Sequence, residues 1–360
     1  MNMNRLIAPP RNSCRRPLTL AAVTLAGALA LAGCGGGGGT GAGDGRPASG
    51  AHPPLGEGET LASRISEARS LADATVFTTD TVAGLLAGED ETTEAFPPER
   101  EMRVRMFRAA SGDEWPTVAI TWEGDPVTFG PEHTRNRVLP GVEYQINCSN
   151  DPAPPQCADT QRGWANYVLW AWRDNFDDYA DGTAEYEHHI PFSAIIPRLT
   201  EDGGRNTYLS AVIGSETAAN ALPSATAEYR GGAAVRFFPP DGWEGHELFF
   251  SDLTLTAEFS GNTVSGVMDN WEKWRDEEAD YSGLAYTVNA APIAGNGFAA
   301  TMEPAADCEG CWPIESSTLA GKFYGPSAEE AGGTIRAVIG DGGGDRAGWI
   351  GSGVFYSKAE

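Results

Sequence analysis

The C-terminal part of the chain repeats one short pattern, an alternation of apolar and polar residues that is broken at intervals by turn residues. Between Leu253 and Phe259 every second residue is apolar, and Gly261-Asn262 then supplies a hairpin turn. Similar strand-like runs are predicted at 225–238, 263–268, 284–289, 296–302, 319–324, 334–339 and 348–356. Together they give about eight strands, the number at which a closed antiparallel barrel is filled by its own side chains. The sequence therefore predicts a mainly β fold with a C-terminal eight-stranded antiparallel β-barrel.

The first residues have the pattern of an export signal. Basic residues from Arg5 to Arg16 precede an apolar segment, Leu18–Leu31, which is too short to span a bilayer. The segment ends in Leu-Ala-Gly-Cys, which is typical of a bacterial lipobox and predicts lipidation of Cys34. The alternative is a plain secretory signal. We expect a lipoprotein signal peptide at 1–33 and a lipidated, Gly-rich tether at 34–56. Gly35 is not the aspartate that would retain the protein in the inner membrane, so we expect an outer-membrane, surface-exposed protein with a lipid anchor.

A glycine-rich stretch, Gly321–Gly333, connects two of the predicted barrel strands. Gly325-Pro326 ends the first strand, because proline fixes φ and has no N–H for a β ladder. Ser327 is a suitable N-cap for a one-turn helix, and the two glutamates at 329 and 330 would lie in its positive first turn. The pair at 332–333 is then expected to close the turn before the next strand.

This stretch combines an aromatic pair, a Gly-Pro step, a glutamate and a Gly-Gly pair, namely Phe323, Tyr324, Gly325, Pro326, Glu329, Gly332 and Gly333. In a lipoprotein-like chain, the combination resembles the signature of the transferrin-binding protein B β-barrel family. That family includes transferrin-binding lipoproteins, haemoglobin-receptor lipoproteins, factor H-binding protein and secreted haem carriers. A second resemblance lies in Leu222–Gly231, where a proline precedes a Thr-Ala-x-Tyr-x-Gly strand. It places the expected barrel domain at 222–360, after a smaller domain at 57–221.

The resemblance implies a binding protein rather than an enzyme. The expected function is a surface lipoprotein that binds a solute, haem or an iron-carrier protein through loops of its β domains, with a role in iron acquisition. The alternative is a surface adhesion or envelope protein without a solute ligand. The sequence carries no catalytic motif of the nucleophile-elbow, zinc-ligand or phosphate-loop type. We expect no cofactor and a monomer.

The net charge of the chain limits the classes of partner that we expect. The formal net charge is −25, and removing the four arginines of the signal leaves −25 − 4 = −29. Such a surface disfavours nucleic acid and anionic lipid, and it allows a basic partner or serves solubility alone.

Four cysteines remain after Cys14 leaves with the signal and Cys34 is lipidated. Among three connectivities, sequence proximity favours Cys148–Cys157 and Cys308–Cys311. Prolines on both sides of the second pair indicate a loop rather than the helix N-terminus of a redox motif.

The segment 57–221 is expected to form a β-rich, handle-like domain with a short N-terminal helix. Leu61, Ile65, Ala68 and Leu71 recur at helical spacing, and 80–88 is a candidate for a second helical turn. Strand-like runs are predicted at 102–107, 118–122, 138–148, 163–172 and 206–214.

Two pairs of residues are candidates for ligand contacts. His188 and His189 follow two glutamates, but neighbours on a strand point to opposite faces, so both cannot enter one pocket. Trp271 and Trp274 lie in a charged run, 270–281, that is either an exposed contact loop or folds back on the barrel. The acidic run at 174–181 lacks the spacing of a calcium loop, and we expect no metal site.

Overall fold

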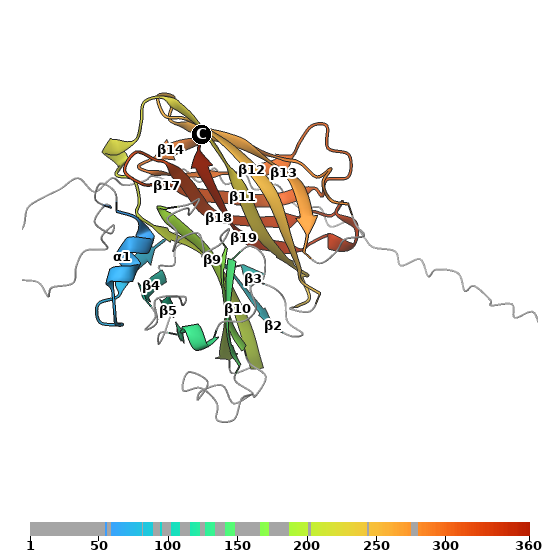
Figure 1. Ribbon diagram of the computed structural model, residues 1–360. Coiled ribbons are helices and arrows are strands. Elements are labelled where there is room, and N and C mark those ends of the chain that lie inside the picture. The colour runs from blue at the N-terminus through green and yellow to red at the C-terminus, as the bar shows by residue number, and fades with distance from the viewer. Residues whose placement is uncertain are drawn as a thin grey trace, which may run out of the picture. The chain divides into compact units, whose positions relative to one another are not determined.

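The computed structural model confirms the mainly β fold class. It describes residues 55, 59–80, 82–88, 94–95, 102–108, 116–122, 127–133, 141–147, 166–172, 187–200, 203–242, 245–274 and 280–360. Within these ranges the regular structure consists of strands, one α-helix near the N-terminus and short 3-10 turns (Figure 1). No helix in the described ranges is both long and apolar enough to cross a membrane.

The C-terminal strands close into the predicted antiparallel barrel. They are β11 (Thr226–Phe238), β12 (Glu247–Glu258), β13 (Thr263–Lys273), β14 (Tyr286–Ala294), β15 (Gly297–Ala300), β16 (Met302–Pro304), β17 (Ile314–Tyr324), β18 (Glu330–Ile339) and β19 (Ile350–Ala359). The sheet runs from β13 through β12, β11, β19, β18, β17 and β15 to β14, and pairing of β13 with β14 closes it. Since β15 and β16 are two pieces of one interrupted strand along β14, the closed barrel has eight strands.

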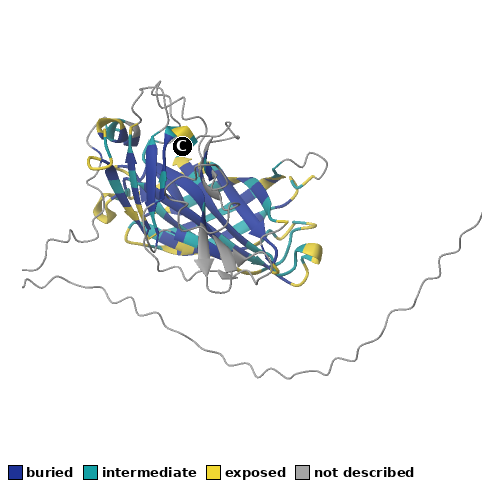
Figure 2. Ribbon diagram, turned by 90° about the horizontal axis from the view of Figure 1, so that it is seen from below, coloured by how far each residue is buried: buried dark blue, intermediate teal, exposed yellow. Residues whose placement is uncertain are grey.

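Side chains from the inward faces of the strands fill the barrel. Phe323, Ile335 and Phe355 belong to one buried cluster, which includes residues of every barrel strand from β11 to β19. Large rings are accommodated by glycines on neighbouring strands. A Cβ on Gly333 would lie only 2.5 Å from the Phe355 ring, so that position admits no side chain. Figure 2 shows the same division, with buried strands and exposed connections.

Two further sheets precede the barrel, and we call their described residues, 55–217, the N-terminal β domain. One sheet has the order β1-β4-β5-β6 and the other β3-β2-β10-β9-β8-β7. The strands are β1 (Thr75–Thr79), β2 (Val82–Gly88), β3 (Glu94–Ala95), β4 (Met102–Phe107), β5 (Thr117–Thr121), β6 (Val127–Phe129), β7 (Gly141–Asn147), β8 (Asn166–Trp172), β9 (His189–Thr200) and β10 (Gly203–Gly214). A common core holds Val104 and Ile120 of the first sheet with Leu209 and Ala211 of the second. The described residues also include three 3-10 turns, at Pro131–His133, Ala219–Ala221 and Gly344–Arg346.

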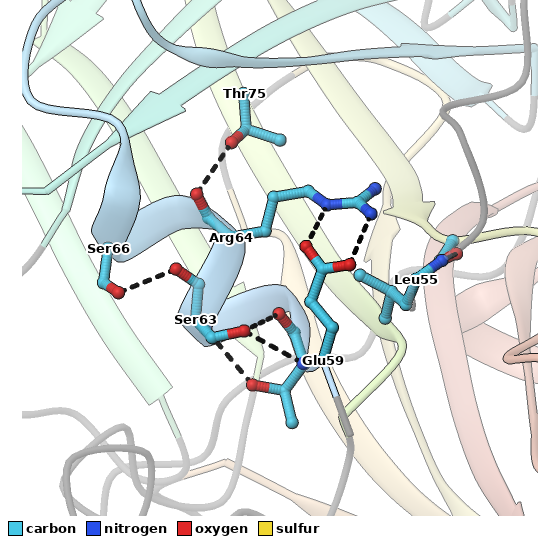
Figure 3. A network of polar contacts seen from close by, with 8 residues as sticks. Leu55, Glu59, Ser63, Arg64, Ser66 and Thr75 are labelled. Carbon is cyan, nitrogen blue, oxygen red and sulfur yellow. Dashed lines mark hydrogen bonds and ion pairs between the residues drawn. The ribbon is translucent and has the colours of Figure 1, made fainter. Parts of the chain in front are cut away.

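The helix α1 (Leu61–Glu67) begins at a capping box. Thr60 Oγ1 accepts from the Ser63 N–H and Ser63 Oγ accepts from the Thr60 N–H, so two otherwise unpaired donors are satisfied (Figure 3). Arg64 holds Glu59 through two hydrogen bonds of 2.7 and 2.8 Å. The helix buries Leu61 and Ile65 as predicted. It ends before Leu71, the last residue of the predicted apolar stripe, and Leu71 is 37% exposed.

Two other predictions of local structure were wrong. Residues 82–88 form strand β2, not a helical turn, because pairing with β10 over its whole length outweighs local propensity. The stretch after Pro326 contains no helix. Residues 325–328 form a turn, and β18 already begins at Glu330, so that Gly332 and Gly333 lie inside a strand.

The structure confirms one of the two disulfides. Cys308 and Cys311 are bonded in a loop between β16 and β17. Cys34, Cys148, Cys157 and the acidic run at 174–181 lie outside the described residues.

Candidate functional site

The glycine-rich stretch contacts the N-terminal β domain through a buried carboxylate. Glu330, the first residue of β18, has a side chain that is 1% exposed. It accepts hydrogen bonds from three successive backbone N–H groups, those of Glu187, His188 at 3.0 Å and His189 at 3.1 Å. It also contacts Nδ1 of His189 at 2.7 Å. We call Glu330 together with residues 187–189 the clasp.

Residues 187–189 of the clasp stabilise the buried negative charge of Glu330. Burial on its own raises the pKa of Glu330, but the hydrogen bond and charge of His189 and the N–H of Glu187 outweigh it, so the pKa lies below its ordinary value. The carboxylate is thus ionised in the folded protein at neutral pH. Several donors for one carboxylate make a fully satisfied site, whereas removing the carboxylate would leave them buried and unpaired.

His189 is enclosed on both faces. Its ring stacks on Tyr324 with centroids 5.0 Å apart, and it is fully buried. Gly332 lies directly against the imidazole, because a Cβ there would be 2.6 Å from Cδ2 of His189. Gly214 likewise leaves room for Tyr324. Two glycines and a tyrosine therefore shape the space that His189 occupies.

Backbone hydrogen bonds extend the clasp along the connection between the domains. Ser215 N–H donates to the His188 carbonyl at 2.8 Å, and Gly325 N–H donates to the Ser215 carbonyl at 2.8 Å. Thr217 Oγ1 donates to the Gly325 carbonyl at 2.7 Å. Nearby, Lys322 Nζ lies 2.8 Å from Glu216 and 2.6 Å from Asp80. The turn at 325–328 is therefore part of the joint between the two domains.

Beyond the clasp, β10 packs against the outer face of the barrel strands. Every second residue of β10 contributes to this contact. The residues between them lie on the opposite face and pack in the core of the N-terminal β domain. Val212 clusters with Val354 and Tyr324, and Tyr208 clusters with Phe238. Between them Ser352 Oγ donates to Ser210 Oγ at 3.3 Å. The apolar clusters and the buried hydroxyls make a continuous interface, which fixes the position of one β layer on the other.

The opposite end of the barrel carries the longer connections, at 239–246, 274–285, 305–313 and 340–349. We call this the loop end. The turns at the clasp end are shorter, at 259–262, 295–296 and 325–329. Arg346 organises the described part of the loop end: it donates to Glu247 at 2.8 Å, and its guanidinium lies 4.9 Å from the centroid of the Trp312 ring. Trp349 and Tyr281 flank the same guanidinium at 5.8 and 5.7 Å.

Exposed carboxylates lie in the same set of connections as this aromatic cluster. In the described part of the loop end they are Asp241, Asp280, Asp307, Glu309, Asp341 and Asp345. The two cations there, Arg346 and Lys273, both pair with Glu247. The loop end therefore combines half-buried aromatic rings with a negative rim, and the Cys308–Cys311 disulfide constrains one of its loops.

The predicted contact residues occupy different places. His189 lies in the clasp, and His188 is half-buried beside it. Trp271 is 4% exposed and packs inside the barrel against Phe249 and Tyr286, so the alternative of an exposed contact loop does not hold at this residue. Trp274 is half-buried and packs against the outside of the barrel. These tryptophans follow the alternative in which they fold back on the barrel.

Sequence reasoning missed Glu330, Arg346 and Trp312. The signal for Glu330 was present in Gly332, an outward glycine two positions along the same strand face, which indicates close packing from outside. Because a one-turn helix was predicted after Ser327, the shared strand face of Glu330 and Gly332 was not recognised. In the described part of the chain no three His, Cys, Asp or Glu side chains gather as metal ligands.

Residues 222–355 match the family model described as C-lobe and N-lobe β-barrels of Tf-binding protein B. The C-terminal domain is therefore a transferrin-binding protein B-like β-barrel, as the Phe323–Gly333 signature predicts.

Solved structures with some similarity include a transferrin-binding protein B mutant from Haemophilus parasuis Hp5, at 12% identity over 79% of this chain and 76% of that one, with a TM-score of 0.33. A protein described as a surface lipoprotein is 14% identical over 78% of this chain and all of that one, with a TM-score of 0.33. Isotype 1 transferrin-binding protein B from serogroup B Neisseria meningitidis is 15% identical over 75% and 56%, with a TM-score of 0.28. TM-scores this low do not establish a shared arrangement of the whole chain. No curated protein sequence matches this chain.

Proposed function

We propose that this chain is a lipid-anchored surface protein that binds a protein partner at the loop end of its barrel. The observation that carries the proposal is the loop end itself, where half-buried Trp312, Trp349 and Tyr281 surround Arg346 inside a rim of exposed carboxylates. Aromatic residues and arginine are enriched in the centres of protein interfaces, and charged residues at their rims.

The filled barrel interior argues against a ligand bound inside the barrel. The barrel interior is filled by a cluster of buried side chains, including Trp271 and Phe249. A haem ligated by His189 would need room at Nε2, whereas the imidazole is fully buried and Gly332 lies against its Cδ2 and Nε2 atoms. A protein that contacts the outer surface requires neither change.

The family of the barrel domain suggests which partner to test first. Its name refers to the binding of transferrin, so we propose a transferrin-type iron carrier as the partner and iron acquisition as the role. The carboxylate rim further predicts that the contacting surface of the partner is basic and that association weakens as salt is raised. Cys34 would carry the lipid anchor, and the Gly-rich segment after it would let the folded part reach a partner.

The test is biolayer interferometry of the purified full chain against iron-loaded transferrin, with haemoglobin as a second analyte. We expect saturable transferrin binding that the double variant Asp341→Asn, Asp345→Asn weakens through a slower association rate. A matched control, Glu258→Gln, changes a carboxylate at the clasp end and should bind as the unmodified chain does. If neither protein binds, or if both variants bind equally, the proposal fails.

A further inference from the structure

A groove with a volume of about 290 Å³ lies on the outer face of the barrel, away from the loop end. Its floor is formed by outward residues of β17 and β18, two of the strands labelled in Figure 1, and its wall by the N-terminal β domain at Asp80 and Val82. The volume is at the lower limit for small-molecule sites. Two cations, Lys322 and Arg336, line this groove, and their surroundings differ.

Lys322 is already neutralised. Its Nζ lies 2.6 Å from Asp80 and 2.8 Å from Glu216. These carboxylates raise the pKa of Lys322 even though burial alone would lower it. An added anion would meet two carboxylates at this end of the groove, so the Lys322 end does not attract a negative charge.

Arg336 is half-buried, and no hydrogen bond or ion pair of its guanidinium is found among the residues the structure describes. It lies on β18 directly opposite Thr318 of β17, with Thr334 two positions along the same face. Burial lowers the pKa of Arg336, which is the expected effect of removing a guanidinium from water without a compensating anion. The groove therefore contains one uncompensated positive charge between two threonines.

We propose that the groove binds the carboxylate of a small monocarboxylic acid, with Arg336 as the anion-binding residue. The planar guanidinium fork matches a carboxylate in bidentate geometry, and the hydroxyls of Thr318 and Thr334 are additional donors. Ala83 and Ala320 supply apolar surface for a short hydrocarbon body. One free positive charge beside a neutralised lysine selects one negative charge, so a dicarboxylate is disfavoured. This inference does not depend on the proposed protein partner.

The test is isothermal titration calorimetry of the full chain with hexanoate and with benzoate at constant ionic strength. We expect saturable binding of at least one of them. Arg336→Gln should weaken it by about ten- to a hundredfold, since a charged hydrogen-bonding partner is lost. Arg336→Lys keeps the charge but not the fork and should also bind more weakly. The control is Arg230→Gln, because Arg230 is also on the outer face of the barrel but is exposed and paired with Glu228.

Thermal unfolding separates a binding role from a structural one. Because Arg336 makes no ion pair with any residue that the structure describes, Arg336→Gln should have the same melting temperature as the unmodified chain or a higher one. The proposal is overturned if neither acid binds saturably, if the glutamine variant binds both acids as well as the unmodified chain, or if the variant melts several degrees lower. It is also overturned if succinate or inorganic phosphate binds and the monocarboxylates do not.

Discussion

The two ends of the barrel are formed by the same strands but differ in the length of their connections and in the groups that meet there. At the clasp end the connections are short, and the buried pair of Glu330 and His189 attaches the preceding domain. At the loop end the connections are longer, and polar and aromatic groups meet around Arg346 near solvent. The clasp end therefore fixes the preceding domain on the barrel, and the loop end provides exposed surface. Residues of the Phe323–Gly333 signature thus contribute to the packing of two domains, whereas the proposed partner contacts lie at the other end of the barrel.

The largest expected effect comes from removing the carboxylate of the clasp. Glu330→Ala should lower the free energy of unfolding by about 3–5 kcal/mol, because it leaves three backbone N–H groups and His189 without their acceptor. Urea unfolding followed by tryptophan fluorescence measures the change. Glu329→Ala is the matched control: Glu329 accepts one hydrogen bond from the exposed Ser327 N–H, so we expect a loss below about 1 kcal/mol. Equal losses in the two variants would remove the distinction between these neighbouring glutamates.

A second prediction concerns the space beside His189. Gly332→Ala places a Cβ against the imidazole and should cost about 1–3 kcal/mol through overpacking. Gly283→Ala, at the loop end, meets no atom within 4 Å and should be almost neutral. The difference between the two melting temperatures measures how much tighter the clasp end is. If the loop-end variant were the less stable one, the comparison would be reversed.

The disulfide gives a prediction for the loop end. Its two cysteines are three positions apart, so the double variant Cys308→Ser, Cys311→Ser should lose at most about 2 kcal/mol of stability by the chain-entropy account. Protection of residues 187–189 from hydrogen exchange should not change. A loss of protection at those residues would mean that the two ends are coupled.

The smallest effect is a dependence on pH. The pKa of Glu330 is lower in the folded protein than in the unfolded chain, so its contribution is complete above the unfolded value, about 4.3. The contribution is lost as the pH falls through the folded pKa. The stability difference between the unmodified chain and Glu330→Gln should therefore shrink as the pH falls below about 4. A difference that grows on acidification would contradict this sign.

The sequence predicts the barrel well and the joint poorly. The alternation of apolar and polar residues and the hairpin turns predicted the barrel strands, because each strand has one face in the core. The clasp joins residues 141 positions apart, and local patterns carry no information about such a contact. The assumed helix after Pro326 shows the error in detail: Ser-x-Glu-Glu satisfies a helix start, but pairing of β18 with β17 and β19 decides the conformation. Arg336 was missed for the same reason, because its surroundings come from two domains.

The most direct test of the clasp is amide hydrogen exchange at residues 187–189. The account predicts that these N–H groups exchange slowly in the unmodified chain, because Glu330 accepts from all three, and rapidly in Glu330→Gln, while the barrel strands stay protected. Rapid exchange at these residues in the unmodified chain would show that Glu330 does not hold the two domains together.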